Sequence, residues 1–239
     1  MSVRAFNGFG EFGVLLRGDA PAQSAWVETW SARRVMVCVG VIILGAGSYG
    51  GAMGYWRAPL QGLFVAIKFP LIMFLTTIGN ALINAMLAPL LGLNLHFRQS
   101  LMAVLMSLTI ASAILGSFSP LIAFLTWNVP SLTGGAKISG TTYGIIQLTH
   151  VGVIALAGIT GNVRLLQVLR QFSGKPAIAY RVLFAWLAGN LFLGSQLTWI
   201  LRPFIGSPDL PVQFLRESAF QGNFYETVFR ALVHLINFD

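Results

Sequence analysis

The chain has 239 residues, of which 56% are hydrophobic and 9% are charged. Soluble domains carry about 25% charged residues, so this composition excludes an ordinary soluble domain and indicates a membrane protein with several spans. The net charge of +8 is not a nucleic-acid signature, because Lys and Arg in membrane proteins mark cytoplasmic loops and contacts with anionic headgroups.

Residues 1–34 mix charged side chains with recurring apolar ones, and they are interrupted by Gly8, Gly10, Gly13 and Pro21. This pattern is typical of a segment that lies on the membrane surface. A loosely ordered terminus is the alternative.

The first predicted span covers residues 35–55 and is rich in glycine. Gly47 and Gly51 are four positions apart, and so are Gly50 and Gly54. Small residues at this spacing let helix backbones approach closely in lipid. We expect this face to pack against another helix of the same chain, with a partner protein as the alternative.

The second predicted span is the long apolar run of residues 60–91. A run of roughly 30 residues exceeds the ~20 that a bilayer needs, so we predict one tilted span, with a broken pair as the alternative. Its one charged residue, Lys68, lies about 12 Å from its start at about 1.5 Å per residue. Asn80 and Asn84 share a helix face and should find partners on neighbouring helices.

An ionisable side chain inside a span is a functional-site hypothesis, and three interpretations of Lys68 remain open. Its flexible stem can lift the ammonium group to the headgroups. Alternatively, the ammonium pairs with Glu217 or Glu226, if Arg202 and the turn at 203–208 bend the chain back over the bundle. In the third interpretation it binds an anion, such as a lipid phosphate.

Three further spans are predicted, over residues 100–127, 141–172 and 181–201. In the fourth span Gln147 and His150 share one face. The fifth contains the small pair Ala185 and Gly189, which suits close helix packing, and the polar residue Gln196.

The predicted fold is an all-α, polytopic transmembrane bundle of about five spans over residues 35–201, between an interfacial segment at 1–34 and an extracytoplasmic segment at 202–239. Residues 222–238 are too polar to span but have apolar residues at helical spacing, so they predict an amphipathic helix at the interface.

The distribution of basic residues predicts an orientation. With five spans, the side of the N-terminus holds nine of them: Arg4, Arg17, Arg33, Arg34, Arg98, Arg164, Arg170, Lys175 and Arg181. The other side holds five: Arg57, Lys137, Arg202, Arg216 and Arg230. The positive-inside rule then places the N-terminus in the cytoplasm and the C-terminus outside.

Three strings along the chain carry a resemblance. They are Lys68-Phe69-Pro70-Leu71, Trp199-Ile200-Leu201-Arg202-Pro203-Phe204-Ile205-Gly206-Ser207-Pro208 and Asn223-Phe224-Tyr225-Glu226. Together they resemble a group of uncharacterised bacterial inner-membrane proteins with a K-x-P-L pattern in an early span and W-x-L-R-P-F-x-G-x-P after a late one. The likeness covers roughly residues 60–232. It implies a bacterial multi-span inner-membrane protein and implies no activity.

The chain offers little for chemistry inside the membrane. All seven carboxylates lie outside the predicted spans, whereas proton-coupled transporters usually carry an acidic relay within them. Three scattered histidines and the single Cys38 show no metal-ligand spacing. His150 could ligate a pigment axially, but a hydrogen bond to a neighbouring residue is the simpler role. We therefore predict no cofactor, no metal and no enzyme.

The leading interpretation is a structural or accessory subunit of a larger bacterial membrane assembly. Its partners would be membrane lipids, anionic headgroups and other subunits or copies of itself, with no nucleic acid. The alternative is a transporter or channel for a small or lipidic molecule, with a polar midplane site around Lys68 that includes Asn80, Asn84, Gln147 and His150. In a scaffold these side chains should point at neighbouring helices, whereas a carrier should show a continuous polar cavity.

Overall fold

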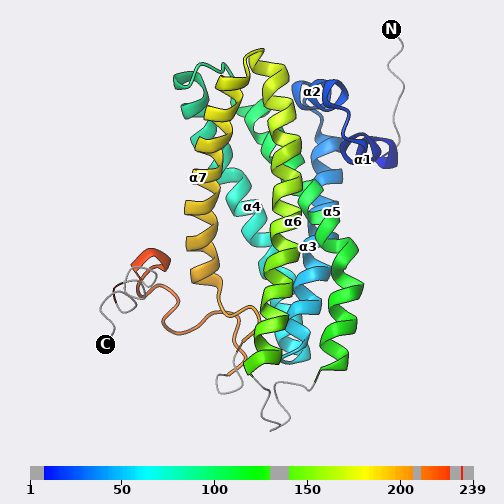
Figure 1. The fold of residues 1–239 in the computed structure, drawn as a ribbon, viewed down its shortest axis with the longest axis vertical. Coiled ribbons are helices and arrows are strands. Elements are labelled where there is room, and N and C mark those ends of the chain that lie inside the picture. The colour runs from blue at the N-terminus through cyan, green and yellow to red at the C-terminus, as the bar shows by residue number, and fades with distance from the viewer. Residues whose placement is uncertain (1–7, 130–139, 207–210, 227–232, 234–239) are drawn as a thin grey trace.

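A computed structural model describes residues 8–129, 140–206, 211–226 and 233, and within these residues it contains helices and no strand. Five long helices form one bundle (Figure 1), and each is long and apolar enough to cross a membrane. They are α3 (Ala32–Tyr55), α4 (Pro59–Leu90), α5 (Phe97–Asn128), α6 (Gly140–Ser173) and α7 (Pro176–Leu201). The predicted all-α, five-span fold is confirmed.

The long apolar run is a single helix, so the alternative of a broken pair is wrong. α4 continues through Pro70, although a proline inside a helix removes one backbone hydrogen bond. Gly92 follows its last turn with a φ of 91°, a left-handed conformation that costs glycine nothing sterically. The Leu93 N–H can then bond to the Ala88 carbonyl at 2.9 Å, which satisfies one of the last carbonyls of the helix.

The glycine face of α3 packs inside the chain, as predicted. A methyl group on Gly50 would lie 2.7 Å from the Val65 carbonyl oxygen, and one on Gly54 would lie 2.7 Å from that of Gln61. Gly47 and Gly51 also face α4, opposite Ala66. The missing side chains therefore let two backbones touch.

α5 is the most enclosed span, since it packs against α3, α4 and α6 and buries the largest share of its apolar stretch. α7 packs against α4 and α6 and buries the smallest share. Its predicted small position, Gly189, faces α4, where an added methyl group would lie 2.8 Å from Asn80 Oδ1. α7 is thus the edge helix of the bundle.

The N-terminal segment folds onto one end of the bundle (Figure 1). It forms α1 (Gly8–Arg17) and α2 (Ala20–Glu28), and Leu15 and Trp26 are buried there. The Glu11 carboxylate accepts hydrogen bonds at 2.9 Å from Trp26 Nε1 and from Arg34 Nε, which also forms an ion pair with it. The alternative of a loosely ordered terminus is therefore wrong for α1 and α2.

The chain beyond α7 turns back along the bundle. Its return is fixed on α7, where the Phe224 N–H donates to Gln196 Oε1 at 3.0 Å and Tyr225 stacks on Phe192 with ring centroids 5.6 Å apart. Residues 224–226 are helical. Most of the predicted amphipathic helix at 222–238 lies outside the described residues.

Candidate functional site

Lys68 lies inside the protein, more than two turns into α4, and its side chain is 0% exposed. Its Nζ atom donates a hydrogen bond to the Pro203 carbonyl oxygen at 3.0 Å. The same atom lies 5.9 Å from the ring centroid of Phe204 and 5.1 Å from that of Phe214, within the range of cation–π attraction. A carbonyl and two aromatic rings therefore surround the ammonium group.

Gln61 lies two turns before Lys68 on the same helix and completes this arrangement. Its Nε2 atom donates to the carbonyl oxygens of Pro203 and Phe204, both at 2.9 Å. Farther along, the Tyr143 hydroxyl on α6 donates to the Gly206 carbonyl at 3.5 Å. These donors bind the return segment, which we define as residues 202–206.

The return segment explains why a cation is buried in α4. Backbone that is not helical leaves its carbonyls without internal partners, and such backbone is tolerated at membrane depth where the protein supplies donors. Lys68 and Gln61 supply them, because positions seven apart lie on one face of a helix. The side chains therefore fix the end of the last span against the second.

This geometry corrects the predictions made for Lys68. The ammonium group does not snorkel, because it is fully buried. Across the described residues no ion pair joins it to Glu217 or Glu226, and Glu217 is exposed. The chain does bend back after Arg202 as expected, but the acceptor that it brings to Lys68 is a carbonyl oxygen. A backbone acceptor leaves no signal in the sequence.

Two of the motif strings meet at this site. Lys68 bonds to Pro203, and the Phe69 ring lies edge-on to Phe204 with centroids 6.0 Å apart. The third string reaches α7 through Phe224 and Tyr225. Residues more than a hundred positions apart in the sequence thus form one contact region.

His150 on α6 has a partner within the chain. Its Nδ1 atom lies 2.9 Å from the Tyr49 hydroxyl of α3, and the two rings meet edge to face at 5.7 Å. The Nε2 atom is buried without a hydrogen-bond partner. Tyr49 could not be picked out from the sequence, because a tyrosine in a glycine-rich span resembles any interfacial aromatic residue.

The remaining predicted polar residues do not join Lys68. Asn80 lies about 18 Å farther along α4 at 1.5 Å per residue, and its Nδ2 atom donates weakly to the Trp186 carbonyl at 3.5 Å. Asn84 is 0% exposed and both of its amide atoms lack partners. Gln147 is exposed on α6. Of these three side chains, Asn80 is the one with a hydrogen bond to another helix among the described residues, and none of the three reaches Lys68.

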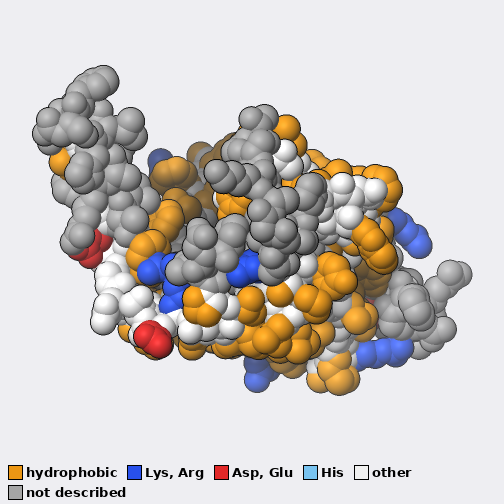
Figure 2. All heavy atoms as spheres, turned by 90° about the horizontal axis from the view of Figure 1, so that it is seen from below, with side chains coloured by type: hydrophobic (Ala, Val, Ile, Leu, Met, Phe, Trp, Pro, Cys, Tyr) orange, Lys and Arg blue, Asp and Glu red, His pale blue; other side chains and the backbone are white. Residues whose placement is uncertain are grey.

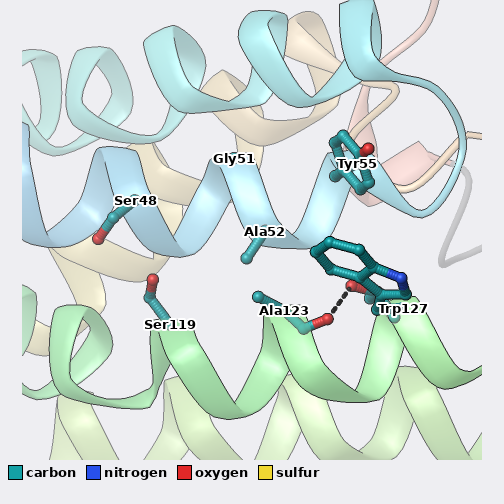
Figure 3. A pocket seen from close by; sticks show the side chains of 8 residues that line it. Ser48, Gly51, Ala52, Tyr55, Ser119, Ala123 and Trp127 are labelled. Carbon is teal, nitrogen blue, oxygen red and sulfur yellow. Dashed lines mark hydrogen bonds between the residues drawn. The ribbon is translucent and has the colours of Figure 1, made fainter.

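A shallow groove opens between α3 and α5 on the outside of the bundle (Figure 3). It has a volume of about 360 Å³ and is lined by Ser48, Gly51, Ala52, Tyr55, Ser119, Ala123, Thr126 and Trp127. Most of these side chains are small, and the Thr126 hydroxyl bonds within its own helix to the Ile122 carbonyl at 3.0 Å. The groove is therefore an apolar surface with few free hydrogen-bonding groups.

The described part of the chain contains no group of three or more His, Cys, Asp or Glu side chains placed to hold a metal ion. No protein-family model matches this chain, and no curated protein or solved structure does either.

Proposed function

We propose that this chain is a structural or accessory subunit that packs laterally within a larger assembly of a bacterial inner membrane. The observation that supports this proposal is that several polar side chains inside the membrane form hydrogen bonds within the chain. Lys68, Gln61 and the pair of Tyr49 and His150 bond to neighbouring elements of the same chain. Such bonds hold helices together and leave those atoms unavailable to a passing solute.

Two surfaces suit lateral contact with another membrane protein. The groove between α3 and α5 is lined by small side chains, which let a second helix approach closely. On α6, Gly144, Gly152 and Gly158 have open space where a side chain would be. We assign the subunit no catalytic reaction, since all of its carboxylates lie outside the five long helices.

The decisive experiment is mass measurement of the intact particle after purification in mild detergent. A scaffold should be recovered with a partner at fixed stoichiometry or as a closed ring of copies. Filling the groove with Ala123→Leu should dissociate that particle, whereas the control Phe184→Leu, on the exposed side of α7, should leave it intact. A monomer that no condition converts to a complex would contradict the proposal.

A transporter or channel for a small or lipidic molecule is the second candidate. It is favoured by the unpaired amide of Asn84 and by buried, unpaired polar atoms of Trp186 and Asn190 on α7. Unpaired buried amides cost about 1–3 kcal/mol, so a passing solute could supply their hydrogen bonds. Asn84→Leu should abolish flux if the chain is a carrier and should leave the assembled particle unchanged if it is a scaffold.

A further inference from the structure

Three buried polar side chains lie where α4 packs against α7. Asn80 and Asn84 of α4 and Trp186 of α7 are each 0% exposed. The two asparagines are four positions apart and share one face of their helix. The Asn80 Nδ2 atom donates to the Trp186 carbonyl oxygen at 3.5 Å, so the two helices meet at these residues. We call the three residues the polar layer.

Asn84 and Trp186 lie at one level of this interface. α4 and α7 run in opposite directions (Figure 1), and an added methyl group on Gly189 would lie 2.8 Å from Asn80 Oδ1. From that contact, Asn84 is one turn farther along α4 and Trp186 is nearly one turn back along α7, which is the same direction in space. Ala88, one further turn along the same face, belongs to the same buried cluster as Trp186. The three side chains therefore share one layer of the interface.

Four buried atoms of the polar layer have no hydrogen-bond partner among the described residues. Two are acceptors, the Oδ1 atoms of Asn80 and Asn84, and two are donors, Asn84 Nδ2 and Trp186 Nε1. Buried polar atoms in proteins are almost always paired, either with other protein groups or with ordered water. The layer therefore requires a further molecule that forms hydrogen bonds.

The equal number of donors and acceptors selects a neutral ligand. A cation would engage the two amide oxygens and leave both N–H groups unpaired, and an anion would do the reverse. Rotating the Asn84 amide by half a turn exchanges its donor and its acceptor and leaves this balance unchanged. Water both donates and accepts, and a buried water typically makes about three hydrogen bonds to otherwise unpaired groups. Water therefore matches the polar layer.

The polar layer lies close to the aqueous side of the membrane. α4 has 32 residues, or about 48 Å at 1.5 Å per residue, which exceeds the hydrocarbon thickness of about 30 Å. If the excess is shared equally between the two ends, the hydrocarbon begins roughly 9 Å before Leu90, at the level of Asn84. Water therefore has a short path to the layer from the membrane surface.

The flank of the bundle beside the polar layer is apolar. Leu82 and Met86 of α4 and Phe184 and Leu187 of α7 are exposed there. Figure 2 views the molecule from the opposite end, and apolar side chains, in orange, line much of its outline there as well. A molecule that forms hydrogen bonds therefore reaches the layer from the aqueous side and not through the lipid.

We propose that the polar layer binds ordered water, which connects the Asn84 amide of α4 to the Trp186 indole of α7. The water accepts hydrogen bonds from Trp186 Nε1 and Asn84 Nδ2 and donates to the amide oxygens. It thereby gives the edge helix a polar attachment to the bundle in addition to its apolar contacts. The inference goes beyond the scaffold role and does not depend on it, because the layer is internal and lies away from the groove between α3 and α5.

The test uses the full chain in lipid bilayers, with ¹⁵N-labelled tryptophan, and measures magnetisation transfer from water protons to each indole N–H by solid-state NMR. Trp186→Phe assigns the Trp186 signal. We expect transfer from water to Trp186, and Asn84→Leu should lower it at least about threefold, because leucine fills a similar volume but offers water no partner.

The matched control is Asn162→Leu, because the Asn162 amide donates to the Gly158 carbonyl of its own helix at 2.8 Å. This variant should leave the transfer to Trp186 unchanged. Asn84→Val, a smaller apolar replacement, takes the place of Asn84→Leu if that variant fails to fold.

Three results would overturn the proposal. The first is an unmodified chain in which no magnetisation passes from water to Trp186. The second is transfer that persists when Asn84 is apolar, which would show that the water does not bind this amide. The third is transfer from lipid acyl protons in place of water, which would show that a lipid chain fills the layer.

Discussion

Lys68 shows how a full charge is accommodated within an apolar helix. Moving an ammonium group out of water is costly unless acceptors replace the water. The Pro203 carbonyl oxygen and the faces of two aromatic rings provide that replacement. The lysine in turn supplies a donor to backbone that has left helical geometry, so each group stabilises the other.

Charge reversal at this residue gives the first prediction. Lys68→Glu would bring a carboxylate against the Pro203 carbonyl, and we expect a loss of about 3–5 kcal/mol in unfolding free energy, as when a buried charge loses its partner. Because the partner is a carbonyl, neither Glu217→Lys nor Glu226→Lys should restore stability. The measurement is the midpoint of denaturant unfolding in detergent.

The exposed Lys175 provides the control, and Lys175→Glu should shift the midpoint little. Recovery of stability in either double variant would show that a carboxylate approaches Lys68, against the geometry described here.

The sequence could identify Lys68 and Arg202 as candidate site residues, but it could not identify Gln61 and Phe214, which complete the site. A charged residue in an apolar run and an arginine before a proline can be recognised in the amino-acid sequence. Gln61 and Phe214 cannot, since a glutamine near a helix start and a phenylalanine in a loop are ordinary residues. Their roles depend on the contact between the return segment and α4, and no local sequence pattern predicts that contact.

At the scale of elements, the contact between α3 and α4 depends on missing side chains. Adding a methyl group at Gly50 would place carbon 2.7 Å from the Val65 carbonyl oxygen, which is backbone and cannot rotate away. We expect Gly50→Ala to destabilise the protein by about 1–3 kcal/mol, the usual range for overpacking. Thermal unfolding in detergent measures this change.

Gly158→Ala on α6 is the matched control, because an added methyl group there has nothing within 4 Å. Alanine in a helix is favoured over glycine by roughly 0.5–1 kcal/mol, so this variant should be slightly more stable. Equal losses in the two variants would show that glycine at position 50 is not required for close packing.

Helices could be predicted from the sequence where apolar runs are long. The apolar run at 60–91 matches α4 within a residue at each end, because a helix that crosses the hydrocarbon must be apolar along its whole length. The short helices α1 and α2 are not evident in the sequence, since glycines interrupt α1, Pro21 stands in the first turn of α2, and Glu11 of α1 bonds to Arg34 of α3. That contact joins residues 23 positions apart.

At the scale of the whole molecule, the five spans place successive loops on opposite sides of the membrane. Asn94, between α4 and α5, and Gln221, after α7, are both exposed and are separated by three spans. The native Cys38 is 0% exposed, so an introduced thiol would be the reactive one.

If the N-terminus lies in the cytoplasm, as the distribution of basic residues predicts, a membrane-impermeant maleimide should label Gln221→Cys in intact cells. Asn94→Cys should react once the membrane is opened. The reversed pattern would invert the orientation, and labelling of both sites in intact cells would contradict three spans between them.

The hydrogen bond between Lys68 and Pro203 can form only late in the synthesis of the chain. The second span enters the membrane while its acceptor, 135 positions later, has not yet been made. Until the ribosome passes residue 203, the ammonium group must be solvated by water, headgroups or the insertion machinery. Completion of the interior therefore waits for the final sixth of the polypeptide, and a chain released before that point would carry an unsatisfied charge, which membrane quality control can recognise.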